Sequence, residues 1–138
     1  MKKIKEKFLV IVKPGFYELH SAILKIFEEN NFEVVEQKTT KFSKKIARQF
    51  YAHLREKPFF QEVVDYMTSD LVFTIIFLGD IEKARELVGD TDPANCQDWQ
   101  IRAIDAKPKD KMHNIVHCSD SVESAEREIA LVDNLPEL

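Results

Sequence analysis

The hydrophobic pattern of the chain alternates between short apolar runs and longer segments with helical spacing. Residues 8–12 form an apolar, β-branched run that ends at Lys13 and Pro14, which is typical of a buried strand entering a loop. Residues 32–40 have the composition of a half-buried strand. Residues 71–78 are nearly all apolar, so we expect this strand to lie at the centre of a sheet or to be covered on both faces.

Apolar residues recur at spacings of three and four in several other segments, which predicts amphipathic helices. The helix boundaries carry suitable capping residues. Ser43 and Asp80 are expected N-caps, and Gly89 fits the end of a helix. Asp120 with Glu123 is the expected capping pair of the last helix. The predicted helices cover residues 19–27, 46–54, 59–67, 81–88 and 122–132.

The order of these elements indicates the fold class. Residues 90–112 show no periodicity, and a loop of this length in a compact domain is usually functional. Residues 115–116 suggest a last short strand before the final helix. Strands that alternate with helices favour one sheet covered by helices, and we expect a mixed or antiparallel sheet of the ferredoxin-like type rather than a doubly wound parallel sheet. No linker or repeat divides the chain, so residues 1–138 are expected to form a single domain.

Composition excludes several classes of protein. The chain has 138 residues and a net charge of -4, which argues against a general nucleic-acid binder or membrane-surface binder. Its 3 glycines cannot form either the G-x-G-x-x-G dinucleotide fingerprint or the G-x-x-x-x-G-K-[ST] phosphate loop. Cys96 and Cys118 have no zinc-site spacing. The N-terminal apolar run is too short for a secretion signal or a membrane span, so we expect a cytoplasmic protein.

Side chains suited to phosphate binding collect around the long loop and its flanks. Arginine offers a planar fork of donors, lysine a point charge and threonine a hydroxyl. His117 ends the last predicted strand and is followed by Ser119, Ser121 and a helix N-terminus, which add donors for an anion. Taken singly, Arg85 and Arg102 are more typical of solvated surface charges, and Lys13 before Pro14 also fits the end of a strand. The set comprises Lys13, Arg85, Thr91, Arg102, Asn114 and His117.

The segment of residues 113–129, HNIVHCSDSVESAEREI, resembles the signature of nucleoside diphosphate kinases. In that family, Asn-x-x-His-[Gly or Ala]-Ser-Asp-Ser is followed by a helix carrying Glu-x-Ala-x-x-Glu-Ile. Further similar elements extend the resemblance over nearly the whole chain; they lie at residues 10–14, 50–60, 87–94 and 101–102. The resemblance implies an α+β fold with a four-stranded antiparallel sheet of ferredoxin-like topology covered by helices, an α/β sandwich.

The resemblance also implies an enzyme. Such a kinase moves the γ-phosphate of a nucleoside triphosphate, typically ATP, to a nucleoside diphosphate by a ping-pong mechanism through a phosphohistidine at His117. Glu128 would hold the other ring nitrogen, and it shares a predicted helix face with Ala125 and Val132. Lys13 and Tyr51 complete the implied catalytic set. The implied nucleotide-binding residues are Lys13, Phe59, Val63, Arg85, Thr91, Arg102 and Asn114.

The family further implies the cofactor and the partners. Mg²⁺ would arrive on the nucleotide without a direct protein ligand, and Asp120 would be the nearest carboxylate, acting through water. The substrates would be nucleoside triphosphates and diphosphates, both ribo and deoxyribo. The chain would form a homo-oligomer, a hexamer or a tetramer, with no nucleic-acid or membrane partner.

The chain departs from the family pattern at several positions. Gly15 follows Lys13 and Pro14 where the family usually has aspartate, and residues 103–113 are more numerous than in the family. Cys118 stands after the histidine where glycine or alanine is usual, which suggests an activity sensitive to oxidation. These changes leave open a non-catalytic nucleotide-binding or regulatory module that keeps the fold. An RNA-binding ferredoxin-like domain is a third possibility, which would require exposed aromatic residues on the central strands.

Overall fold

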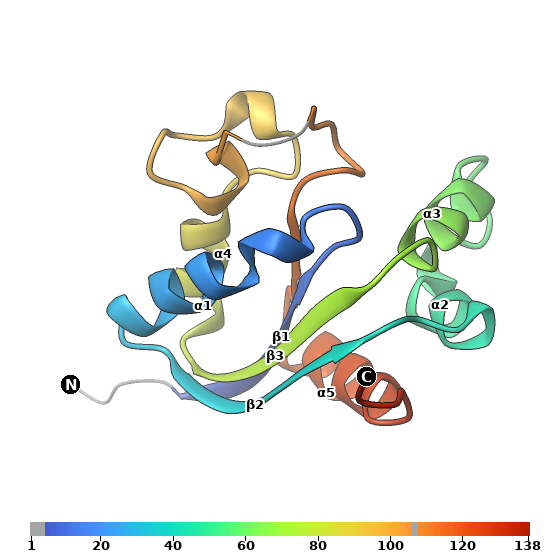
Figure 1. The fold of residues 1–138 in the computed structure, drawn as a ribbon, viewed down its shortest axis with the longest axis horizontal. Helices are drawn as coiled ribbons and strands as arrows, with labels where there is room; N and C mark the ends of the chain where they lie inside the picture. Colours follow the sequence, from blue (N-terminus) through green and yellow to red (C-terminus); the bar gives the residue numbers. More distant parts are fainter. Residues whose placement is uncertain (1–4, 106–107) are drawn as a thin grey trace.

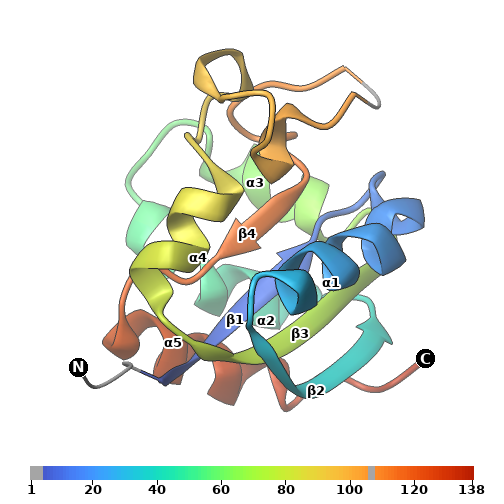
Figure 2. The same cartoon turned by 90° about the vertical axis from the view of Figure 1, so that its left-hand side faces the viewer.

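The fold is built on one antiparallel sheet. A computed structural model describes residues 5–105 and 108–138 of the chain. Four strands pair in the order β2-β3-β1-β4, and every neighbouring pair is antiparallel (Figures 1 and 2). This is the predicted α+β fold with ferredoxin-like strand order. The strands are β1 (Glu6–Val12), β2 (Glu33–Thr40), β3 (Val72–Gly79) and β4 (Val116–Cys118).

Both faces of the sheet are covered by helices. Helices α1 (His20–Glu29) and α4 (Ile81–Val88) lie on one face, and three further helices lie on the other (Figure 1). Side chains alternate along each strand, so Val10 of β1 packs toward α1 and α4 while Ile11 packs toward the other three helices. The three are α2 (Lys44–Phe50), α3 (Phe60–Met67) and α5 (Val122–Val132).

The apolar strand β3 lies in the interior of the sheet, as its sequence predicts. It pairs with β1 on one side and with β2 on the other, and its first six residues are all buried. The aromatic residues of the two central strands, Phe8, Phe73 and Phe77, are 0 to 7% exposed. An RNA-binding sheet surface needs such residues on the outside, so the described part of the sheet does not support that alternative.

Most predicted helix boundaries agree with the structure. The Ser43 hydroxyl accepts a hydrogen bond from Ile46 N, and the Asp80 carboxylate accepts from Glu82 N. Gly89 ends α4 with φ of +98°, a conformation that costs glycine little. The predicted helix of residues 46–54 is interrupted, because α2 ends at Phe50 and a short 3₁₀ turn follows.

The predicted capping pair of the last helix is wrong. Ser121, not Asp120 with Glu123, is the N-cap of α5, and its hydroxyl accepts from Ser124 N at 3.1 Å. Ser121 has the extended backbone that an N-cap requires, and it directly precedes the first helical residue. Asp120 lies one residue too early, although its carboxylate also hydrogen-bonds the Ser124 side chain.

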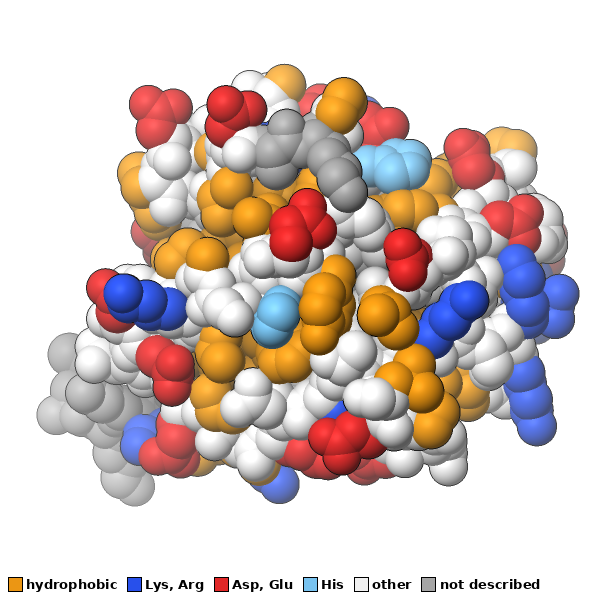
Figure 3. Space-filling model, in the orientation of Figure 1, with side chains coloured by type: hydrophobic (Ala, Val, Ile, Leu, Met, Phe, Trp, Pro, Cys, Tyr) orange, Lys and Arg blue, Asp and Glu red, His pale blue; other side chains and the backbone are white. Residues whose placement is uncertain are grey.

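The long segment between α4 and β4 lies above one end of the sheet (Figure 2). Its described residues contain two 3₁₀ turns, Pro93–Asn95 and Ile101–Ala103, and it rejoins the sheet at Ile115, whose carbonyl accepts from Lys13 N at the end of β1. Acidic and basic side chains are mixed over the face seen in Figure 3, in keeping with the small net charge. The loop and the ends of β1, α3 and β4 together form the candidate site.

Candidate active site

A hydrogen-bonded chain of three side chains connects β4 with α5. His117 Nε2 lies 2.9 Å from Glu128 Oε1, and the Ser119 hydroxyl donates to the same oxygen at 2.7 Å. The Glu128 side chain is only 5% exposed, so both contacts are shielded from water. The predicted pairing of His117 with Glu128 is therefore present, and the carboxyl group fixes the orientation of the imidazole ring.

The Ser119 hydroxyl has a different role from the one that the sequence suggests. The sequence indicates a hydroxyl available to an anion, but the Ser119 hydroxyl is buried and used by Glu128 and by the backbone of Leu9. The spacing between His117 and Ser119 could have indicated that the two side chains share a face. Residues 117 and 119 are two apart on an extended segment, so their side chains point to the same face. Ser119 is thus a support for Glu128.

The other nitrogen of the His117 ring, Nδ1, makes no hydrogen bond to any residue that the structure describes. The imidazole is 20% exposed, and the Phe50 ring packs edge-on against it with centroids 5.1 Å apart. An imidazole that is held at Nε2 and packed on its side, with Nδ1 unused, can offer Nδ1 as a nucleophile.

The backbone before His117 is strained. Ile115 has φ of +77°, and Val116 N donates to Asn114 O at 2.9 Å, closing a three-residue turn around it. A β-branched residue rarely adopts this conformation, and such strain tends to occur at functional sites. The turn directs Asn114 into the loop and His117 into β4.

Two buried polar atoms at the site have no hydrogen-bond partner. They are the Tyr51 hydroxyl and Arg102 Nε; the only other such atom among the described residues is Thr40 Oγ1. Burial raises the pKa of Tyr51 well above its usual value, and the neighbouring Glu128 adds to the effect. Unpaired buried donors are costly, so these two groups are suited to a ligand that supplies acceptor oxygens.

Lys13 and Asn114 lie at the entrance of the loop. The Lys13 ammonium donates to Asn114 Oδ1 at 2.8 Å and to Met112 O at 3.2 Å. Asn114 is 1% exposed, and its amide donates to the carbonyls of Thr91 and Lys111. Burial, and secondarily the positive charge of Arg102, lowers the pKa of Lys13 to about 7. An anion bound here would restore the charge of the lysine.

Two arginines donate to the backbone carbonyls of the residues that precede and follow His117 in the chain. Arg102 donates to Gly89 O and to Val116 O, both at 2.9 Å, and thereby ties the loop to β4. Burial lowers the pKa of its guanidinium from the usual value. Arg85 of α4 donates to Cys118 O at 3.4 Å. Each arginine keeps donors beyond those used in these bonds.

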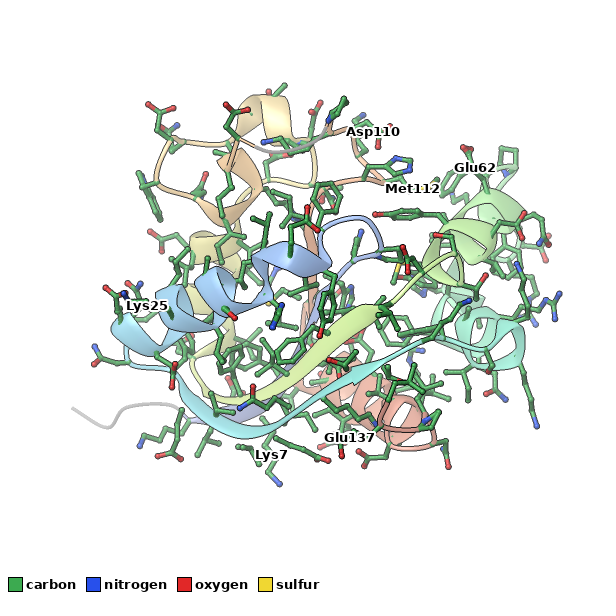
Figure 4. All side chains as sticks on the ribbon, in the orientation of Figure 1. Lys7, Lys25, Glu62, Asp110, Met112 and Glu137 are labelled. Atoms are coloured by element: carbon green, nitrogen blue, oxygen red, sulfur yellow. The ribbon has the colours of Figure 1, made fainter. Side chains whose placement is uncertain are left out.

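Two of the predicted nucleoside-binding residues belong to the first turns of α3. Phe59 is 43% exposed at the start of α3 rather than buried, and Val63 follows four residues later. A pocket of about 470 Å³ lies between α3 and the loop, and its lining includes Glu62 of α3 but neither Phe59 nor Val63. Figure 4 shows Asp110 and Met112 on the loop opposite the end of α3 that bears Glu62. The pocket is lined by Glu62, Asp92, Lys109, Asp110, Lys111, Met112 and His113.

Cys118 does not lie beside the reactive ring, as adjacency in sequence had suggested. Its side chain packs with Val10 and Val116 in the core under α1 and α4, whereas His117 contacts Phe50 and Glu128 on the opposite face. Burial raises the pKa of the thiol to about 12. The thiolate is the reactive form, so the expected sensitivity to oxidation has no structural basis here.

Comparisons with known proteins fit this geometry. The sequence model of the family described as nucleoside diphosphate kinase matches residues 6–135. The chain belongs to the nucleoside diphosphate kinase family. A nucleoside diphosphate kinase of Pyrococcus abyssi is 42% identical over 92% of this chain and 83% of its own length. That of Helicobacter pylori strain P12 is 40% identical over 92% of this chain and 94% of its own.

Solved structures of the family share the fold. The Aquifex aeolicus nucleoside diphosphate kinase superposes with a TM-score of 0.86 at 36% identity, covering 93% of this chain and 94% of the other. A Halobacterium salinarum nucleoside diphosphate kinase, solved in complex with CDP, has the same TM-score at 31% identity, covering 97% and 93%. The chain is accordingly a phosphotransferase of the family, which transfers phosphate between nucleotides through a phosphohistidine.

The remaining expectations concern metal and location. Among residues 5–105 and 108–138, no group of three or more His, Cys, Asp or Glu side chains is arranged to hold a metal ion. Asp120 is exposed, and hydrogen bonding from Ser124, together with nearby Arg85, lowers the pKa of its carboxyl group. In the described part of the chain no helix is both long and apolar enough to cross a membrane.

Proposed function

We propose that His117 Nδ1 carries the phosphoryl group in this chain. The observation that supports this most directly is the bond between Nε2 and the buried Glu128 carboxyl, because it favours the proton on Nε2 and leaves the lone pair on Nδ1. That lone pair attacks the γ-phosphorus, the bond from phosphorus to the bridging oxygen breaks, and the diphosphate leaves with those electrons. A second diphosphate then takes the phosphoryl group by the reverse reaction.

The charged and phenolic groups around His117 are proposed to hold the phosphates. Lys13 and Tyr51 would contact the transferred group, and Arg85, Thr91 and Arg102 would bind the polyphosphate. The unpartnered Tyr51 hydroxyl and Arg102 Nε support this assignment, because phosphate oxygens would satisfy both. Preorganised donors of this kind lower the barrier by stabilising the charge that develops during transfer.

The nucleoside is proposed to lie between α3 and the loop. Phe59 would stack on the base with Val63 beside it, and Asn114 would contact the sugar 3′-hydroxyl. The exposure of the Phe59 ring supports stacking. Apolar stacking does not distinguish base edges, so we propose that the enzyme accepts ribo- and deoxyribonucleotides with several bases.

Mg²⁺ is proposed as the cofactor, bound to the nucleotide. When present it neutralises phosphate charge. The residue that fits it is Asp120, whose exposed and ionised carboxylate can accept hydrogen bonds from metal-bound water. Homo-oligomer assembly, as a hexamer or tetramer, and a cytoplasmic location are also proposed from family membership; light scattering of the purified chain measures the assembly.

The assignment of His117 is tested by labelling. Wild-type protein is incubated with Mg²⁺ and γ-labelled ATP, and acid-labile, alkali-stable label is measured before and after a chase with GDP. We expect label on the wild type that discharges into GTP, and none on His117→Ala. His53→Ala serves as the matched control, because His53 is exposed in a 3₁₀ turn and, among the described residues, the histidine that bonds Glu128 is His117. Label on His117→Ala would refute the assignment, and unlabelled wild type that still binds nucleotide would favour the binding-module alternative.

A further inference from the structure

The loop that departs from the family pattern is organised by one carboxylate. Asp110 Oδ1 accepts from Met112 N at 2.9 Å and from His113 N at 2.7 Å, and it lies 2.9 Å from His113 Nδ1. Asp110 N in turn donates to His113 O at 3.2 Å. The side chain of Lys109 also donates to Ile104 O, across the base of the loop. Residues 110–113 therefore form a closed turn with a defined shape.

The same turn is joined to α3 by an aromatic contact. The His113 ring packs on the Tyr66 ring with centroids 4.2 Å apart and planes at 51°. The Tyr66 hydroxyl donates to Pro14 O at 2.6 Å, and the adjacent Lys13 donates to Met112 O. These contacts thus link the loop to α3, α3 to the segment after β1, and that segment back to the loop.

These linked contacts border the open pocket of about 470 Å³ described above. Asp110, Met112 and His113 line it from the loop, and Glu62 lines it from α3, as Figure 4 shows for the residues labelled there. The His113–Tyr66 contact joins the loop to α3, the two elements that flank the pocket.

We propose that His113 and Asp110 are positioning residues that set the width of the nucleoside pocket. The proposal rests on the proposed function, in which the nucleoside lies between α3 and the loop. Neither residue is among the hydrogen-bond or ring contacts of His117. Their loss therefore weakens nucleotide binding and leaves phosphoryl transfer within the bound complex nearly unchanged, since a preformed pocket lowers the cost of ordering on binding.

The test compares His113 with a matched histidine elsewhere. His20 also packs on a tyrosine: its ring centroid lies 4.5 Å from that of Tyr17, and its Nδ1 lies 2.7 Å from Tyr17 O. His20 belongs to α1 and does not line the pocket. Three quantities are measured for each variant: Kd for Mg·ADP by calorimetry, kcat, and the rate of single-turnover labelling at saturating ATP. The variants are His113→Ala, His113→Phe, Asp110→Ala and His20→Ala.

We expect His113→Ala and Asp110→Ala to raise Kd about five- to tenfold with the labelling rate changed less than about twofold. His113→Phe keeps the ring on Tyr66, so Kd should return to within about twofold of the wild type, and His20→Ala should leave Kd unchanged. If His113→Ala fails to fold, Asp110→Ala and His113→Phe provide the comparison.

The proposal is overturned if His113→Ala and Asp110→Ala bind Mg·ADP as the wild type does. It is also overturned if they slow labelling at saturating ATP while Kd stays constant, or if His20→Ala raises Kd equally. Failure of the proposed function is separately visible, because the wild type itself would then take no label on His117.

Discussion

Lys13 is predicted to take up a proton when the enzyme binds a nucleotide. Its ammonium is held by Asn114 and Met112 in a buried site near Arg102, which lowers its pKa to about 7. At pH 8 only about a tenth of the free enzyme carries this charge. A polyphosphate beside Lys13 stabilises the charged form and returns the pKa toward its usual value, so binding at pH 8 should take up about 0.9 proton.

The sign of the pH dependence follows. Because binding takes up a proton above pH 7, the observed Kd should rise with pH, with a slope that approaches about tenfold per pH unit.

The same shift in the pKa of Lys13 also affects folding stability. The unfolded chain holds the Lys13 proton up to its usual pKa of about 10.4, whereas the folded chain releases it above about 7, so between these values this group makes stability increase with pH. Below pH 7 both states are protonated, and the cost of burying the charge is present in full.

Calorimetry in buffers of different ionisation enthalpy measures the uptake. Mg·ADP is titrated into the wild type and into Lys13→Arg, which keeps a charge that does not titrate in this range. We expect the observed enthalpy to vary with buffer for the wild type and much less for Lys13→Arg. Equal buffer dependence in the two proteins, or a wild-type Kd that is constant from pH 7 to about pH 9, would show that Lys13 is already charged in the free enzyme.

Three further substitutions test the site and the scaffold. Tyr51→Phe removes a buried hydroxyl that has no hydrogen-bond partner, so thermal denaturation should show a free energy of unfolding that is unchanged or higher by up to about 1 kcal/mol. Single-turnover labelling should slow. A loss of stability would mean that the hydroxyl is paired. Ser119→Ala deprives Glu128 of one of its two partners and should cost about 1–3 kcal/mol in urea unfolding and slow labelling, whereas unchanged kinetics would contradict its supporting role. Gly89→Ala should destabilise by about 1–3 kcal/mol, because φ is +98° and a Cβ would lie 2.7 Å from Cys96 Sγ; an unaltered melting temperature would argue against that backbone.

Local rules determined much of the fold from the sequence. The apolar run of residues 71–78 identified a central strand because burial on both faces leaves no polar positions. Ser43, Asp80 and Gly89 marked helix ends because capping uses backbone groups within a few residues. Ser121 was missed in favour of Asp120 because neighbouring polar residues compete for the cap, and only the backbone conformation selects between them.

The sequence by itself also specified the family, because the motif around His117 has a characteristic spacing. The candidate site residues follow from that resemblance and are proposals for this chain. The family resemblance implied Glu128 as the partner of His117, and the structure contains that contact. Neither the resemblance nor the helix pattern indicated Ser119 as the second partner of Glu128, since that contact joins a strand end to a helix. Alternation along β4 places Cys118 on the face opposite His117, whereas only the tertiary structure decided that His113 packs on Tyr66. Such contacts bring together residues far apart in the chain, and no local pattern encodes the distance between them.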